Sequence, residues 1–367
     1  MARSAARCFA CLLAVSTVSA IRAEQAEESA NLVFEPIDLE GDMILRALAF
    51  DLTYDMESPR AEAFDLFAEI VASPEFILTD KLLLHTELRM ENITRAEEDR
   101  YFEALGFFVR QLYLKYKATD RLDVIAGKHS PTFAVASLIV PGMYGNSYNK
   151  DIELIERIGG GLEYTVDSGA YGTHIYKAYT FFKDISVLAK SLGEERTRIR
   201  NSDGGASNTE SFDSFSFSIE GMNIARLPDL RYKLGTVYQS GGVGDPGDEK
   251  GVSLTVTQDY FLKNQSNVLL IGEVARMWEY EATLDDAFYA TAAVFYNTAS
   301  WTAGISGTYR YREDVDLGET YDDYSIQLMI KYNLTSDWFI EFAQEFNRDE
   351  NLRGNQFGMR LVRLFDF

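Results

Sequence analysis

The amino-acid sequence predicts an all-β protein, a 16-stranded antiparallel transmembrane β-barrel with long external loops and short periplasmic turns. Two patterns carry the prediction: segments of about ten residues in which apolar and polar side chains alternate, and connections that are alternately short and long. A third observation excludes the other way of crossing a membrane. No stretch after residue 20 approaches the roughly 20 apolar residues that a membrane helix needs.

The N-terminal residues have the pattern of a secretory signal peptide, which we expect to span 1–20. Its first seven residues carry two arginines and no acid, an apolar stretch follows from Cys8, and small residues before Ala20 form a cleavage pattern. Cleavage after Ala23 is the alternative. Because Cys8 and Cys11 are the two cysteines of the chain and both lie in the signal, we expect an exported protein without disulfide bonds.

The composition of the chain limits its partners. It is 46% hydrophobic and 13% aromatic, contains 24 Phe and 21 Tyr against 7 Pro, and has a formal net charge of −22. Such an acidic chain is a poor partner for nucleic acid, because like charges repel. An exported, acidic and aromatic-rich protein fits either an outer-membrane barrel or a secreted β-sandwich, so the strand pattern must decide between them.

The alternating pattern separates a tail from the barrel. Residues 21–42 are acidic and unpatterned, and we expect a periplasmic tail there. The barrel covers 43–367: fifteen strands are apparent, and a weaker one at 43–54 makes sixteen, an even number as expected of a bacterial barrel. In 213–221, for example, apolar residues alternate strictly with serines and a glutamate. A helix, with its period of 3.6, would mix the two faces.

The connections between these strands alternate in length. The short ones contain turn residues and lie at 79–81, 118–120, 167–169, 225–229, 262–266, 297–300 and 334–337. The long ones lie at 92–102, 130–156, 184–211, 241–250, 279–285, 313–320 and 348–354. Outer-membrane barrels have short periplasmic turns and longer external loops, whereas a secreted sandwich has no reason to alternate so regularly. The alternation therefore favours the barrel and assigns its two ends.

The last strand, 356–367, is amphipathic and ends in Phe367. It resembles the signature by which outer-membrane barrels are handed to their assembly machinery. This resemblance implies a location in the outer membrane of a Gram-negative bacterium. Arg363 is the one charged residue on the outward face of this strand, and a charge that faces lipid is tolerated near a membrane interface.

The lumen of a sixteen-stranded barrel is wide enough for water, so its inward-facing side chains carry any function. On the alternating registers these include nearly equal numbers of acids and bases, and opposed charges favour small polar solutes. The alternative is that a polar lumen is only what contact with water requires. The basic side chains that we expect along the pore wall are Lys115, Lys117, Arg231, Lys233, Arg310, Arg312 and Lys331.

The connection 130–156 is the third long one when counted from the proposed first strand, and it is unusually apolar for an exposed loop. Its apolar side chains need burial, which packing on the inner wall of the barrel would provide. The alternative is a lid packed against a neighbouring subunit. The apolar side chains are Phe133, Val135, Leu138, Ile139, Val140, Met143 and Tyr144.

In its length, loop order and last strand, the chain resembles the 16-stranded porin family, whose members fold the third loop inward to constrict the pore. Residues 111–131 resemble the strand-turn-strand before this loop in phosphate-selective and related porins, whereas 130–156 lacks the Pro-Glu-Phe-Gly-Gly type motif of general porins. The resemblance implies a homotrimer and a constriction at this loop. The residues that it would place there are Lys150, Asp151, Glu153 and Glu156, facing Arg89, Arg121 or Arg157.

Catalytic chemistry finds little support in the sequence. His85, His129 and His174 lie on separate predicted strands, and no spacing pairs any of them with a nucleophile or with other metal ligands. No Gly-rich phosphate loop or calcium-loop pattern is present either. We therefore expect no enzyme, no metal and no cofactor.

Together these features predict a passive diffusion channel for small hydrophilic solutes or ions, in contact with outer-membrane lipid and lipopolysaccharide. Arg196, Arg198 and Arg200 in 184–211 are candidates for binding lipopolysaccharide, although such runs are more often only solvated. Two alternatives for function remain. One is a substrate-specific channel with a binding site at the 130–156 constriction, and the other is a non-conducting barrel used for adhesion or structure.

Overall fold

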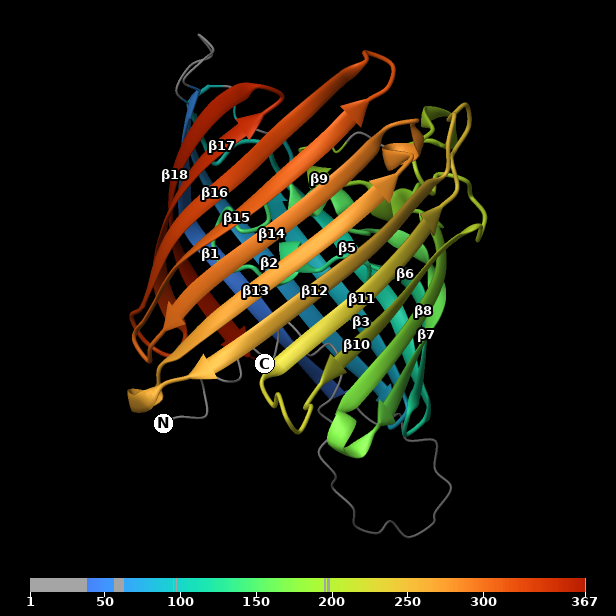
Figure 1. Ribbon diagram of the computed structural model, residues 1–367, viewed down its shortest axis with the longest axis horizontal. Helices are drawn as coiled ribbons and strands as arrows, with labels where there is room; N and C mark the ends of the chain where they lie inside the picture. Colours follow the sequence, from blue (N-terminus) through green and yellow to red (C-terminus); the bar gives the residue numbers. More distant parts are fainter. Residues whose placement is uncertain are drawn as a thin grey trace.

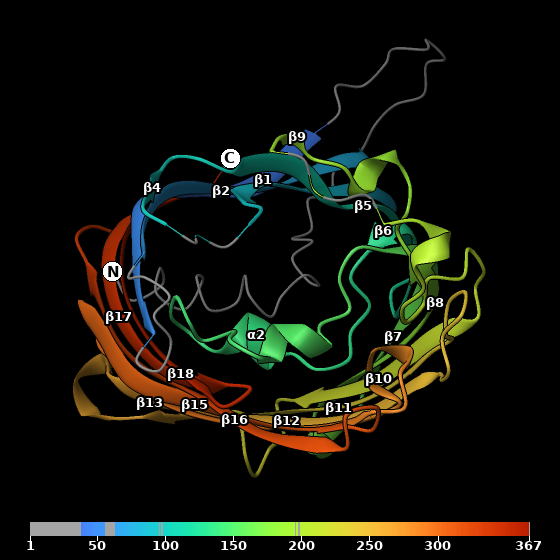
Figure 2. The same ribbon diagram turned by 90° about the horizontal axis from the view of Figure 1, so that it is seen from above.

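The computed structural model describes residues 38–55, 63–94, 96, 98–194, 196 and 199–366. Its strands form one sheet that closes on itself, because β1 (Asp38–Asp55) pairs antiparallel with both β2 (Ala63–Thr79) and β18 (Leu352–Asp366). Of eighteen strands, β4 (Arg100–Tyr101) and β9 (Leu192–Gly193) have two residues each, which leaves sixteen long ones. The strands are steeply tilted in side view (Figure 1) and form a ring from above (Figure 2). The predicted 16-stranded antiparallel barrel is confirmed.

The long strands between β2 and β18 pair antiparallel with their neighbours around the ring, and short helical turns occur only in the connections of the described chain. These strands are β3 (Leu82–Asn92), β5 (Leu105–Thr119), β6 (Leu122–His129), β7 (Arg157–Asp167), β8 (Thr173–Lys183), β10 (Ser214–Met222), β11 (Leu230–Gln239), β12 (Glu249–Phe261), β13 (Asn267–Trp278), β14 (Asp286–Asn297), β15 (Trp301–Asp314), β16 (Glu319–Asn333) and β17 (Trp338–Asp349). The helical turns are α2 (Ala136–Ile139), η1 (Asn149–Ile152), η2 (Gly169–Tyr171), η3 (Val187–Ala189), η4 (Asn201–Asp203), η5 (Lys263–Gln265) and η6 (Tyr280–Ala282).

The connections follow the predicted alternation except near the C-terminus. Every predicted short turn joins two consecutive strands at the lower end of the barrel in Figure 1. The prediction of a long loop at 348–354 is wrong, because β17 and β18 are joined by Glu350 and Asn351 alone. Both have positive φ, of 48° and 71°, as in the tight hairpin turns that match the twist of antiparallel strands. The connection predicted at 313–320 is likewise shortened, to 315–318.

The start of the barrel differs from the sequence boundary. The first strand begins at Asp38, whereas the pattern placed it at 43–54 and assigned 21–42 to a tail. The signal peptide, the rest of the tail and Phe367 lie outside the described residues. In the part of the chain that the structure describes, no helix has the length and apolar character needed to cross a membrane.

The two faces of the strands differ as the period-two pattern predicts. On β10, Phe215 is 52% exposed on the outside while Ser216 is 2% exposed on the inside. The same division holds on β16, where Ile326 and Leu328 point outward and Gln327 inward. On β18 the outward Arg363 guanidinium lies over the rings of Trp338 and Phe365, at 5.2 and 4.1 Å from their centroids. Its charge is thus placed among aromatic side chains near a strand end, where interfacial girdles occur.

The apolar core of the protein lies inside the ring, between segment 130–156 and the strands. Figure 2 shows α2 within the barrel, against the wall that contains β11, β12 and β16. Phe133 is 1% exposed and belongs to one buried cluster, while Ile139 and Tyr144 belong to a second. The wall accommodates the segment through small residues. A Cβ on Gly235 would lie 2.6 Å from the Phe133 carbonyl oxygen, so this strand position requires a glycine.

Candidate functional site

Segment 130–156 is held to the barrel by polar side chains of the inward faces. The Glu273 carboxylate on β13 accepts hydrogen bonds from the backbone N–H groups of Val135 and Ala136, at 2.7 and 2.9 Å. On β16, the Gln327 amide accepts from Tyr144 N–H at 2.8 Å and donates to the Pro141 carbonyl at 2.9 Å. Because the segment has no strand partner of its own, these side chains satisfy backbone groups that would otherwise be buried without hydrogen bonds.

The returning half of the segment is anchored by Arg310 on β15. Its guanidinium pairs with Asp151 at 2.9 Å and with Asp323 at 2.7 Å, contacts Asp349, and lies 4.1 Å from the centre of the Tyr148 ring. Burial raises the pKa of the Asp151 carboxyl above its ordinary value, although the charge of Arg310 opposes this. Since one guanidinium serves three carboxylates, it compensates Asp151 incompletely for the loss of water.

On the opposite side the segment meets β5. Glu153 accepts a hydrogen bond from Arg110 at 2.9 Å, and Arg110 also lies 3.7 Å from Glu87 on β3. Gln111, the next residue, donates to the same Glu87 carboxylate at 2.6 Å. Two consecutive side chains can reach one inward carboxylate because the β3–β5 pairing has a register shift here, which is a β-bulge.

Segment 130–156 divides the inner surface of the barrel into two walls. We call the inward faces of β10 to β17 the covered wall, because the segment packs on them and side chains such as Gln327 and Glu345 are each 1% exposed. We call the inward faces of β2 and β3 the open wall. There the side chains of Glu75, Arg89 and Glu91 are 36%, 23% and 30% exposed. These three inward-facing charges of the open wall therefore remain partly accessible to water.

Several of the predicted pore-wall bases belong to ion pairs that bridge neighbouring strands. Lys115 lies 3.1 Å from both Asp123 and Glu163, and Lys233 lies 3.0 Å from Glu220, which also pairs with Lys177 at 3.0 Å. These six side chains, three acids and three bases, lie one each on β5, β6, β7, β8, β10 and β11. They form a band that neutralises its own charge, so its members carry less net field into the lumen than isolated bases would.

The other predicted pore-wall bases lie toward the two ends of the barrel. Arg312 pairs with Glu350 at 2.5 Å at the external end. At the other end, Lys117 lies 3.8 Å from Asp120, Arg231 is exposed at the beginning of β11, and Lys331 lies over the Phe339 ring at 5.1 Å. Of the predicted set, Arg310 contacts segment 130–156, through its ion pair with Asp151.

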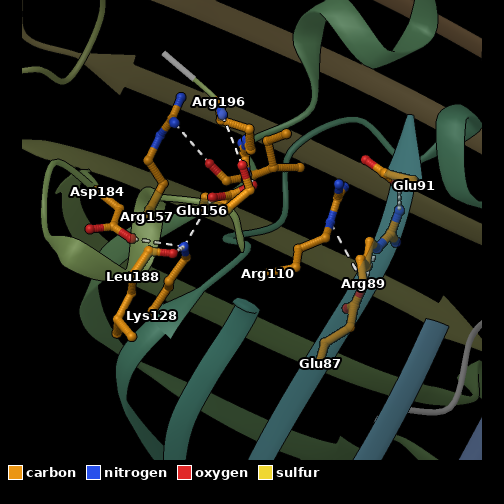
Figure 3. Close-up of polar contacts among 12 residues, drawn as sticks. Glu87, Arg89, Glu91, Arg110, Lys128, Glu156, Arg157, Asp184, Leu188 and Arg196 are labelled. Carbon is orange, nitrogen blue, oxygen red and sulfur yellow. Dashed lines mark hydrogen bonds and ion pairs between the residues drawn. The ribbon is translucent and has the colours of Figure 1, made fainter. Parts of the chain in front are cut away.

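The predicted constriction residues are near the expected segment but have other partners. Lys150 is exposed, Asp151 pairs with Arg310, and Glu153 pairs with Arg110. Glu156 pairs with Lys128 at 2.9 Å and with Arg196 at 2.8 Å, as Figure 3 shows. In the part of the chain that the structure describes, none of these acids forms an ion pair with Arg89, Arg121 or Arg157.

The three predicted arginines are separated from one another. Arg89 pairs with Glu87 at 2.6 Å and with Glu91 at 3.5 Å, and so belongs to the open wall (Figure 3). Arg157 donates to the Ile155 carbonyl and to Gln239 at the external end of β7. Arg121 lies in the short turn before β6. The whole of that strand, about 25 Å at 3.3 Å per residue, separates it from segment 130–156, so its assignment to the constriction is wrong.

The sequence prediction missed Arg110 and Lys128. Strict alternation from Lys115 places Arg110 outward, and the bulge at 110–111 reverses that direction. Lys128 also has outward parity relative to the inward Ile125, but segment 184–194 covers it and it is 2% exposed. The alternation of apolar and polar residues within one strand reveals neither the bulge nor the covering segment, because both depend on residues far along the chain.

The histidines have structural neighbours. The His85 ring stacks on Tyr113 at 4.8 Å between centroids and its Nδ1 lies 3.0 Å from Glu75. His129 lies on another side of the same tyrosine, at 6.4 Å, so two residues expected on separate strands converge on Tyr113. Among the described residues, no group of three or more His, Cys, Asp or Glu side chains is arranged to hold a metal ion.

No protein-family model and no curated protein matches the chain. Solved structures do. OprB of Pseudomonas putida aligns with a TM-score of 0.60 at 12% identity, covering 90% of this chain and 94% of that one. The outer-membrane channel DcaP of Acinetobacter baumannii gives 0.56 at 10% identity, covering 90% and 97%. A trimer form of OmpT, an outer-membrane protein of Vibrio cholerae, gives 0.52 at 12% identity, covering 90% and 99%. The chain thus has the fold of the outer-membrane β-barrels of Gram-negative bacteria.

Proposed function

We propose that this protein is a channel of the Gram-negative outer membrane through which small hydrophilic solutes or ions diffuse. One observation carries the proposal: segment 130–156 buries the covered wall and leaves charged side chains of the open wall accessible to water. A barrel used only for adhesion or as a structural element has no need of hydrated charges along one inner wall, whereas a water-filled path requires them.

The charged side chains of the open wall are the groups that a solute in the lumen would contact. Glu75, Glu87 and Glu91 alternate there with His85 and Arg89, and Arg110 with Glu153 adds a bridge to the segment. Charges of both signs at close range favour small polar solutes that exchange water for hydrogen bonds on either side. A substrate-specific channel is the second form of the same proposal, in which these groups bind one solute tightly enough to saturate the current.

The assembly and cellular context of the chain belong to the same proposal. DcaP is described as an outer-membrane channel and OmpT has been solved in a trimer form, which supports a channel and a homotrimer here. The exposed outward side chains, such as Leu254 and Val274, are suited to outer-membrane lipid and to the acyl chains of lipopolysaccharide. Residues 1–20 would act as the signal peptide for export.

Single-channel recording in planar bilayers tests the proposal. Wild-type protein should conduct in steps, and Arg89→Gln should shift the permeability ratio toward cations by up to about fivefold, since one charge at about 4 Å in water acts with ~1 kcal/mol. The control Arg121→Gln, at the short turn, should leave the ratio near that of wild type. Absence of any conductance would contradict the proposal. A current that saturates and is blocked by one solute would establish the substrate-specific form.

A further inference from the structure

Segments 130–156 and 184–211 meet at the external end of β6 to β8. The second segment leaves β8 and returns to β5, where Gly193 pairs with Gly106 in the β5–β9 ladder. It therefore crosses the ends of β6 and β7. The two segments and the ends of β7 and β8 line a partly open cavity of about 120 Å³, several times the ~30 Å³ that one water molecule occupies. The cavity is lined by Ile155, Glu156, Arg157, Lys183, Asp184, Ala189, Arg196 and Ile199.

The two acids of this cavity are already neutralised. Lys128, whose side chain is 1% exposed, lies 2.9 Å from Glu156 and 2.8 Å from Asp184, and also donates to the Leu188 carbonyl. Arg196 shares Glu156 at 2.8 Å. Figure 3 shows Lys128 and Arg196 reaching these carboxylates from two directions. The carboxylates of Glu156 and Asp184 are thus taken up by Lys128 and Arg196.

Two further cationic side chains in the cavity wall, Arg157 and Lys183, form no ion pair with an acidic side chain among the described residues. Arg157 is 9% exposed, and its guanidinium donates hydrogen bonds to the neutral oxygens of Ile155 and Gln239. Its Nε and the Nη1 of Arg196 are buried without a hydrogen-bond partner. Lys183, half-buried at the end of β8, forms no ion pair with any described residue. A buried cation without a counter-ion is costly, because it has lost water and gained no opposite charge.

More distant acids do not replace the missing counter-ion. Glu249 acts on Arg157 through space and is bridged to it by the amide of Gln239, but the two form no ion pair among the described residues. Asp245 and Glu281 act on Lys183 through space without forming an ion pair among the described residues. Asp245 is already engaged by the backbone N–H groups of Gly205 and Gly242, at 2.7 Å each. The excess positive charge therefore remains local to the cavity, in a chain whose net charge is −22.

We propose that this cavity is a binding site for one phosphate-type oxyanion, held by Arg157, Lys183 and Arg196. Guanidinium donors and an ammonium group are the residue types that bind such an anion, and three donor groups match its several oxygens. The anion supplies the charge that the two unpaired cations lack. It also joins the external ends of β7 and β8 to segment 184–211, so it stabilises the mouth of the barrel without lying on the open wall. Its source is either a free anion or the phosphate of a lipopolysaccharide headgroup.

Calorimetric titration of the purified full chain in detergent tests the site, with inorganic phosphate as the probe at constant ionic strength set by chloride. One phosphate should bind per chain, and Lys183→Gln should weaken binding by at least about tenfold through the loss of a charged hydrogen bond. Lys183→Arg should restore most of it. Lys263→Gln, an exposed lysine in a short turn at the other end, is the matched control and should bind as wild type does.

A second arm identifies the source of the phosphate. The melting temperature is measured in mixed micelles that contain lipid A with or without its phosphates. A rise with phosphorylated lipid A only, lost in Lys183→Gln, assigns the headgroup as ligand, and binding of inorganic phosphate alone assigns a free anion. If neither probe binds, or if Lys183→Gln binds both as well as wild type, the proposal is overturned. Conductance is not used as a readout, so the outcome is independent of whether the barrel is a channel.

Discussion

The covered wall and the open wall contain the same kinds of inward-facing residue, but these residues have different binding partners. Glu273 on the covered wall and Glu87 on the open wall are both inward glutamates of long strands. Glu273 accepts backbone N–H groups of segment 130–156, whereas Glu87 holds Arg89, Gln111 and Arg110 on the margin of the accessible lumen. Both carboxylates are buried, at 4% and 8% exposure, so the two walls differ here in their partners: Glu273 binds the loop, and Glu87 binds side chains of its own and the neighbouring strand.

The covered wall explains how an apolar loop is tolerated inside a polar barrel. Polar strand residues bond to the backbone of the segment, and its apolar side chains pack on one another and on inward aromatic residues such as Phe295 and Tyr289. Leu138 is the exception among the apolar residues that were expected to be buried, since it is 42% exposed. It lies on α2, on a side that does not face the covered wall, where water replaces the strand side chains.

The largest effect is expected when the part of segment 130–156 that packs on the covered wall is deleted. Replacing residues 136–146 by Gly-Ser-Gly deletes α2 and the contacts to Gln327, while the Arg310 and Arg110 anchors remain. The covered wall should then meet water as the open wall does, and single-channel conductance should rise at least about twofold because the lumen of a sixteen-stranded barrel is no longer filled. Planar-bilayer recording gives the conductance directly.

A deletion in a different loop is the control, and it tests whether the rise in conductance is specific to the loss of segment 130–156. Shortening 241–245 alters a loop that hydrogen-bonds to Gly205 of segment 184–211. This variant should conduct within the range of wild type. If the 136–146 deletion conducts no more than wild type, then segment 130–156 does not limit the path, and the distinction between covered and open walls has no functional meaning.

A smaller test weakens one anchor of the covered wall. In Glu273→Ala the N–H groups of Val135 and Ala136 and the hydroxyl of Thr255 lose their acceptor. The free energy of unfolding should fall by about 3 kcal/mol, since buried donors left unsatisfied cost about 1–3 kcal/mol each and part of this is recovered by relaxation. Urea unfolding in lipid vesicles measures it. Glu273→Gln keeps an amide oxygen as acceptor and should lose distinctly less; equal stability of both variants and wild type would disprove the anchor.

The same comparison shows what local sequence could predict. Period-two alternation predicts the face of each strand residue because a side chain one position along must point the other way. It therefore identified the barrel, and the apolar composition of 130–156 identified a segment that needs burial. Residue partners were harder. Asp151 pairs with Arg310, distant in sequence, and Arg110 enters through a bulge. Such pairings depend on how far around the ring the loop extends, which no single strand encodes.

The smallest expected effect concerns Asp151, which joins the returning half of the segment to the covered wall through Arg310. Because burial raises the pKa of this carboxyl, the folded chain binds its proton more tightly than the unfolded chain does. The stabilisation from that proton is complete below the unfolded value and is lost as pH rises through the folded one. Asp151→Asn should thus lie within about 1 kcal/mol of wild type at pH 7, since Arg310 keeps Asp323 and Asp349, and wild type should gain on the variant as the pH falls below 5. Urea midpoints at several pH values measure the difference, with the exposed Asp120→Asn as control. A difference that instead favoured the variant at low pH would mean that the pairing with Arg310 outweighs burial at this carboxylate.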